Sequence, residues 1–249
     1  MSVNVEWVGH ACFRVWRDDG PVIVMDPYHL ATLERLGLPK GSPQLEGDFV
    51  IVSSLTDPAH GDPSRVRGNP RVINALDLVV NGIEVEVDGS PIIALAAAES
   101  PNHPEGPKDN ALYAVQIGGI WIMHMGDLGY GLSAQELSPF VDRCDVLLAL
   151  VGGGLTIPLQ DLDFLIDYLK PKWIIPMHYD LPPFTAKMFP VGDFLARRSQ
   201  DTLIYLRSTT VRLPLEVPGK GSPTILVLEP SGYRPSRHCQ LETVSESRP

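Results

Sequence analysis

The chain has 249 residues, of which 44% are hydrophobic and 20% charged, so it can bury the core of an α/β domain. A formal net charge of -10 and the lack of a Lys/Arg run exclude a nucleic-acid backbone as the expected partner. Three cysteines without CxxC spacing exclude a disulfide framework, and no signal peptide or spanning apolar stretch is found, so we expect a cytoplasmic protein without a membrane partner.

The first half of the chain is predicted to consist of short strands separated by turn residues. Residues 3–7, 12–16 and 21–25 have the pattern of an antiparallel meander. Residues 49–52 are continuously apolar, which is typical of a strand buried on both faces. The loop after them follows a strand end, where α/β folds place their chemistry. Further strands are predicted at residues 71–73, 82–87 and 92–95.

The second half predicts a hairpin and then a strand–helix–strand unit. Strands at residues 113–117 and 120–123 flank two glycines and deliver His124 and Asp127 to a loop. An apolar pattern of helical spacing then lies between two buried strands. The remaining predictions are a candidate lid at 100–110, strands at 146–150, 173–175, 203–206 and 224–228, and helices at 159–169 and 191–200.

This order of elements predicts two sheets covered by helices, a four-layer αβ/βα sandwich of the α/β class. We assign residues 1–230 to a single domain. Residues 231–249 are polar and without periodicity, and we expect a tail that is flexible or used in contacts between subunits.

Three segments that follow strands can carry chemistry. His178 suits either a divalent-metal ligand or a core histidine. Asp127 suits a metal bridge or a general base, and equally a plain turn. The glycines at 152–154 precede a helix, which indicates either an anion site at the helix N-terminus or a tight connection, and the tight connection is favoured.

Five segments agree, in order, with motifs of one family over residues 3–230. They read WVGHA at 7–11, VMDP at 24–27, HMGDLGY at 124–130, GGGLT at 152–156 and KPKWIIPMHY at 170–179. Together they resemble the metallo-β-lactamase superfamily, in the branch of the ascorbate-6-phosphate lactonase-like and N-acyl phosphatidylethanolamine phospholipase D-like proteins. The shared order makes chance agreement implausible, although each motif alone is modest.

The resemblance implies metal ligands from an H-x-H-x-D-H segment, a further His, a bridging Asp and a last His. Asp127 and His178 match the last two, and Glu99 stands near the place of the further His, with His103 close behind. The first segment admits two alignments. Without a gap its ligand positions fall on Ser54, Thr56, Pro58 and Ala59, and with a one-residue insertion they fall on Leu55, Asp57, Ala59 and His60.

A site rebuilt on this scaffold would be rich in carboxylates, which favour Mn, Mg or Fe over Zn. Its members would be Asp57, His60, Glu99, Asp127 and His178. The family pattern has two metal positions, and because Asp127 and His178 are retained we expect a hydrolase that uses a single remaining divalent ion, either Mn, Fe or Zn, on a small ester, lactone or phosphoester. Asp127 would hold the nucleophile, and His10 or His124 would support the ligands from behind.

Two alternatives stay open at this point. One is a metal-free, catalytically inactive member of the fold that serves as a binding or structural protein, since the first ligand segment is heavily altered. The other is acid–base catalysis without a metal by Glu99, Asp127 and His178. The expected partners are a small-molecule substrate and, as the resemblance implies, further copies of the same chain.

Overall fold

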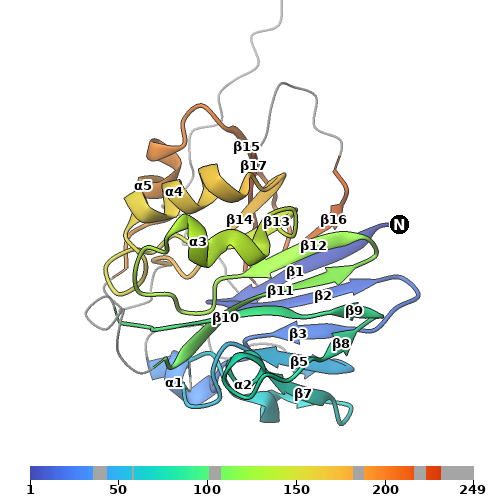
Figure 1. The fold of residues 1–249 in the computed structure, drawn as a ribbon. Helices are drawn as coiled ribbons and strands as arrows, with labels where there is room; N and C mark the ends of the chain where they lie inside the picture. Colours follow the sequence, from blue (N-terminus) through green and yellow to red (C-terminus); the bar gives the residue numbers. More distant parts are fainter. Residues whose placement is uncertain (36–43, 58, 101–107, 182–187, 216–222, 231–249) are drawn as a thin grey trace, which may run out of the picture.

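The computed structural model describes residues 1–35, 44–57, 59–100, 108–181, 188–215 and 223–230. Two mixed β-sheets face each other, with helices on their outer sides, so the predicted α/β sandwich is confirmed (Figure 1). The predicted tail and residues 101–107 of the candidate lid lie outside the described residues. The division into a domain of residues 1–230 and a tail therefore stays a prediction.

The first sheet contains the N-terminal strands and one strand from near the C-terminus. In spatial order it consists of β16 (Thr210–Leu213), β1 (Val3–Gly9), β2 (Cys12–Arg17), β3 (Ile23–Met25), β5 (Phe49–Val52) and β7 (Arg71–Asn74). Strands β1, β2 and β3 form the predicted antiparallel meander, whereas β3, β5 and β7 run parallel. The ends of β3 and β5 therefore lie at the same edge of the sheet.

The second sheet begins with the predicted hairpin and continues with parallel strands. Its order is β10 (Ile93–Ala97), β11 (Asn110–Ile117), β12 (Ile120–His124), β13 (Val146–Leu150), β14 (Trp173–Met177), β17 (Thr224–Val227) and β15 (Thr202–Tyr205). Because β12, β13 and β14 are parallel neighbours, the loops that follow them meet at one edge. Those loops carry Asp127, Gly152 and His178.

The helices are short apart from α4, which covers the second sheet. They are α1 (Leu30–Arg35), α2 (Ala75–Val80), α3 (Ala134–Leu137), α4 (Leu159–Leu169) and α5 (Val191–Arg197). Leu162, Leu165, Ile166 and Leu169 are buried at helical spacing, as predicted, because this stripe faces the sheet. Lys170 then ends α4 in a left-handed conformation, with φ of 52°.

One predicted strand is largely absent. Of residues 82–87 only β8 (Glu86–Val87) is extended, paired with β9 (Ser90–Pro91). Gly82 has φ of 63°, and the amide of Ile83 donates to the carbonyl of Leu78, so this segment closes α2 instead. Of the alternating apolar residues there, Ile83 is exposed and only Val87 lies in a strand. The remaining short strands, β4 (Leu45–Glu46) and β6 (Val66–Arg67), form a small pair.

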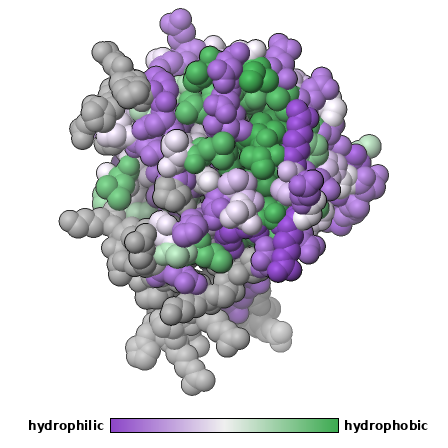
Figure 2. Space-filling view, turned by 90° about the horizontal axis from the view of Figure 1, so that it is seen from below, coloured by the Kyte–Doolittle hydropathy of each residue, from purple (hydrophilic) through white to green (hydrophobic). Residues whose placement is uncertain are grey.

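The core lies between the two sheets. Trp7 and Phe13 from the first sheet and Tyr113 from the second are fully buried there. Apolar side chains are also exposed near α2 and the edge strand β7: Val72, Val79, Val80 and Ile83. Figure 2 shows hydrophobic side chains gathered on this underside. Among the described residues no helix has the length and apolarity that crossing a membrane requires. The assembly of several copies of this chain stays a prediction.

Candidate metal centre

A buried carboxylate organises the edge where the two sheets meet. Asp26 follows β3, is fully buried, and has φ of 44°. It accepts hydrogen bonds from the amide and hydroxyl of Ser53, at 2.8 and 2.7 Å, and from the hydroxyl of Tyr113, at 3.0 Å. Burial by itself would raise the pKa of Asp26, but His124, His60 and Ser53 lower it. Asp26 therefore carries a negative charge inside the core.

This carboxylate fixes the ring of His60. The Nδ1 atom of His60 lies 3.1 Å from Oδ2 of Asp26, so Nδ1 carries the hydrogen of this bond, and Nε2 is the ring nitrogen that remains for a metal. Nε2 lies 3.7 Å from Oδ2 of Asp127 and 3.8 Å from Oδ2 of Asp57. Burial opposes protonation, yet the charges of Asp127, Asp26 and Asp57 raise the pKa of His60 to about 10.

Asp127 and His178 complete this wall of the centre. The amide of Asp127 donates to Oδ1 of Asn110 at 3.0 Å, and Oδ1 of Asp127 lies 3.7 Å from Nε2 of His178. Gly126 allows the approach, because a Cβ at that position would collide with Asn110. Burial raises the pKa of Asp127, and burial together with the charge of His60 lowers the pKa of His178 to about 3.

A third imidazole enters from the turn after β1. The rings of His10 and His178 have centroids 4.0 Å apart, and those of His10 and His60 are 5.1 Å apart. Burial lowers the pKa of His10 well below its usual range. Ligand atoms of His10, His60 and His178, the histidine group, lie within 4.8 Å of one another, and so do those of Asp57, His60 and Asp127, the acidic group.

Two of the predicted site residues are not in either group. Nε2 of His124 donates to the carbonyl of Ala11 at 2.8 Å, and its Nδ1 accepts from the amide of Gly126 at 2.9 Å. Both ring nitrogens are thus occupied by backbone, so His124 can hold the loop of Asp127 but cannot bind a metal. Glu99 is partly buried, and burial with the charges of Asp57 and Asp127 raises its pKa to about 8.

The two alignments of the first ligand segment place different residues near the centre. The insertion alignment contains Asp57 and His60, which are the residues that reach the centre. In the ungapped alignment Ser54 and Thr56 hydrogen-bond each other at 2.9 Å instead. Pro58 and His103 lie outside the described residues. Asp26 was visible beforehand only as a D-P turn, and Ser53, Tyr113 and Asn110 gave no recognisable signal.

The donor set fits a small divalent cation. Within the described residues, Nε2 of His60 and Oδ1 of Asp127 are buried and have no hydrogen-bond partner, which is costly for polar atoms. The nitrogen–oxygen distances between these imidazoles and carboxylates are 3.7 to 3.8 Å, which is too long for hydrogen bonds. They are close to the separation of about 3.4 Å between two ligands in a tetrahedral shell with bonds of roughly 2.0–2.1 Å.

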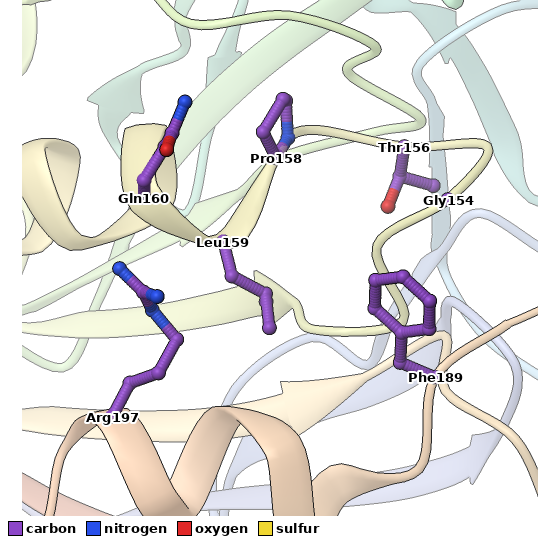
Figure 3. A pocket seen from close by; sticks show the side chains of 7 residues that line it. All are labelled: Gly154, Thr156, Pro158, Leu159, Gln160, Phe189 and Arg197. Atoms are coloured by element: carbon purple, nitrogen blue, oxygen red, sulfur yellow. The ribbon is translucent and has the colours of Figure 1, made fainter.

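The glycines that follow β13 serve packing. A Cβ on Gly152 would collide with the carbonyl oxygen of His178, and one on Gly153 with the ring of Phe189. This is the tight connection favoured by the sequence. A surface cavity of about 400 Å³ lies beside it, and Figure 3 shows Arg197 and Gln160 at one end. Its lining residues are Gly154, Thr156, Pro158, Leu159, Gln160, Phe189 and Arg197, none of which belongs to the two ligand groups.

A sequence profile described as "Beta-lactamase superfamily domain" matches residues 4–178 of this chain. The chain belongs to the beta-lactamase superfamily. The matched span ends on His178 and contains every residue of the histidine and acidic groups.

The chain is also similar to proteins of named classes. A "UPF0173 metal-dependent hydrolase" of Thermococcus onnurineus is 24% identical over 202 residues, which are 74% of this chain and 88% of that protein. The corresponding protein of Pyrococcus abyssi is 26% identical over 206 residues, with the same shares covered.

Solved structures show the same fold. A Thermotoga maritima protein, named as a candidate zinc-dependent hydrolase of the metallo-beta-lactamase superfamily, is 27% identical with a TM-score of 0.65. The alignment covers 91% of this chain and 100% of that one. Igni18, a metallo hydrolase of Ignicoccus hospitalis, is 20% identical with a TM-score of 0.58 over 80% of this chain and 91% of that one, a likeness of fold alone.

Proposed function

We propose that this protein is a metal-dependent hydrolase with one divalent ion, which acts on a small ester, lactone or phosphoester. Asp57, His60, Asp127 and His178 are the residues we assign to the ion. The observation that carries the proposal is the orientation of His60, whose Nδ1 is held by Asp26 so that the buried Nε2 faces two carboxylates. A ring held in this way is the usual arrangement of a metal-binding histidine.

The same geometry supports the assignment of a single ion. His60 is shared by the histidine group and the acidic group. Because Asp26 engages Nδ1, His60 has one nitrogen left, and one nitrogen binds one ion. This sharing of His60 supports one ion rather than two.

The chain's own residues would divide the hydrolytic work between them. When bound, a divalent ion supplies Lewis-acid polarisation of the substrate oxygen and activation of water. The side chain of Asp127 remains 21% exposed, so it can reach solvent and accept the proton of the attacking water. His124 holds the loop of Asp127 because its Nδ1 accepts a hydrogen bond from the amide of Gly126. The names of the UPF0173 relatives support hydrolysis as the reaction class.

Metal content and turnover, measured together, test this proposal. The full chain, purified without chelator or a histidine tag, should contain about one equivalent of metal and hydrolyse p-nitrophenyl esters, lactones or bis-p-nitrophenyl phosphate. Asp127→Ala should lose both properties, whereas Asp77→Ala, which removes an exposed carboxylate on α2, should lose neither.

Three results would contradict the proposal. A chain that stays metal-free after incubation with Mn²⁺, Fe²⁺ or Zn²⁺ would support the binding or structural role. Activity that survives exhaustive chelation would support metal-free acid–base catalysis by Glu99, Asp127 and His178. An Asp127→Ala variant that retained metal or turnover would show that the assigned residues are wrong.

A further inference from the structure

We propose that His10 binds the ion directly and forms a three-imidazole face with His60 and His178. This inference rests on the proposed function and changes the identity of the ligand set. The four residues assigned above contribute two carboxylates and two imidazoles. With His10, imidazoles become the majority, and they come from three separate segments: the turn after β1, the loop after β5 and the loop after β14.

The backbone places His10 in an unfavourable conformation to bring its ring here. The register of β1 and β2 shifts between Trp7 and Gly9, and His10 then has φ of 53°. A bulge of this kind redirects the side chain that follows it, and a left-handed φ is costly for a residue other than glycine. A turn that only reversed the chain would be served better by glycine or asparagine. A role for the imidazole itself explains why histidine occupies this strained position.

Backbone hydrogen bonds fix His10 relative to His178. The carbonyl of His10 accepts from the amide of His178 at 3.2 Å and from the indole of Trp7 at 3.0 Å. His178 has the same unusual backbone, with φ of 54°. One backbone hydrogen bond thus joins two strained residues, and their imidazole rings lie side by side.

The side chains meet in a buried space. His10 is 7% exposed and His178 is 6% exposed, while His60 is fully buried. Their rings are tilted against one another by 37° for His10 and His178 and by 57° for His10 and His60. Nitrogen atoms from the three rings lie within 4.8 Å of one another, a grouping that small movements of the side chains would close around one ion.

The enlarged ligand set alters the expected metal. A carboxylate-rich site favours Mn, Mg or Fe, but imidazole suits Zn, Cu, Fe and Ni, and Co²⁺ exceeds Mn²⁺ in general affinity for such sites. We therefore expect Zn²⁺ and Co²⁺ to bind more tightly than Mg²⁺ or Mn²⁺. This preference differs from the expectation drawn from the sequence, because His10 was placed behind the ligands rather than among them.

The test counts imidazole ligands. The full chain is loaded with Zn²⁺, and X-ray absorption spectra measure the number of imidazoles bound to zinc in the wild type and in His10→Gly. Glycine suits φ of 53° at residue 10, so the fold should persist. His10→Asn, which also tolerates this conformation, is the second variant. His29→Ala removes an exposed histidine from the loop between β3 and α1 and is the matched control.

The expected result is three imidazoles in the wild type and His29→Ala, two in both His10 variants, and at least a tenfold loss of Zn²⁺ affinity in those variants. Two imidazoles in the wild type and unchanged in His10→Gly would overturn this inference and leave the proposed function intact. A wild-type chain that bound no zinc would overturn this inference, and binding of no divalent ion at all would overturn the proposed function as well.

Discussion

Asp26→Asn changes one atom of the buried network and should weaken metal binding while keeping the fold. Asparagine has the shape of aspartate and tolerates the φ of 44° at this position. Its Oδ1 can still accept from the amide of Ser53 and from Tyr113. Its NH₂ group then faces Nδ1 of His60 and donates to it, so Nδ1 must accept and cannot carry a hydrogen. The ring hydrogen moves to Nε2, where it blocks the atom that faces Asp57 and Asp127.

The size of each effect can be estimated from the network. Loss of the partner that orients a metal-binding histidine typically costs about 10–100-fold in metal affinity. Asp26 accepts four hydrogen bonds, from both donors of Ser53, from Tyr113 and from His60. Each would lose about 1 kcal/mol of charge assistance, but the variant no longer buries a charge, so we expect a net destabilisation of about 1–3 kcal/mol.

Three measurements check this prediction. Isothermal titration with Zn²⁺ gives the affinity, and thermal unfolding of the metal-free protein should show a decrease in Tm of about 2–4 °C for each kcal/mol. Nitrogen NMR of His60 reports which ring atom carries the hydrogen. If Asp26→Asn bound zinc as tightly as the wild type, with the hydrogen still on Nδ1, the proposed orientation of His60 would be refuted.

Two further predictions concern the loop after β13 and the cap of α3. Gly152→Ala should weaken metal binding at least tenfold by pushing the carbonyl of His178 aside, whereas Gly192→Ala, where a Cβ meets nothing within 4 Å, should have no effect in the same titration. Ser133→Ala should lower the free energy of unfolding by about 1 kcal/mol in urea, because Ser133 and Glu136 form a capping box. Hydrogen bonds from Ser133 lower the pKa of Glu136, so the ionised side chain stabilises the fold above its unfolded-state pKa. The difference in free energy of unfolding between wild type and Glu136→Gln should therefore vanish as the pH falls through the folded-state pKa of Glu136.

Much of the fold could be predicted because it is written in local periodicity. The apolar stripe of α4 and the hairpin of β11 and β12 follow from the spacing of side chains that must face the core. The error at residues 82–87 has the same origin, since an alternating apolar pattern does not state whether it lies on a strand or against a helix end. The loops of Asp127 and His178 were predictable as strand ends for the same reason.

The sequence by itself determined which strands are buried and which loops follow them, because burial imposes a period on the residues of each element. The convergence of His60 on Asp127, and of His10 on His178, was decided by the tertiary structure alone. Asp57 and His60 lie in an irregular loop with no period, and the orientation of His60 comes from Asp26, 34 residues away in the chain. Side chains that meet only through strand order and loop conformation leave no local pattern, so the sequence alone allows two alignments of this loop.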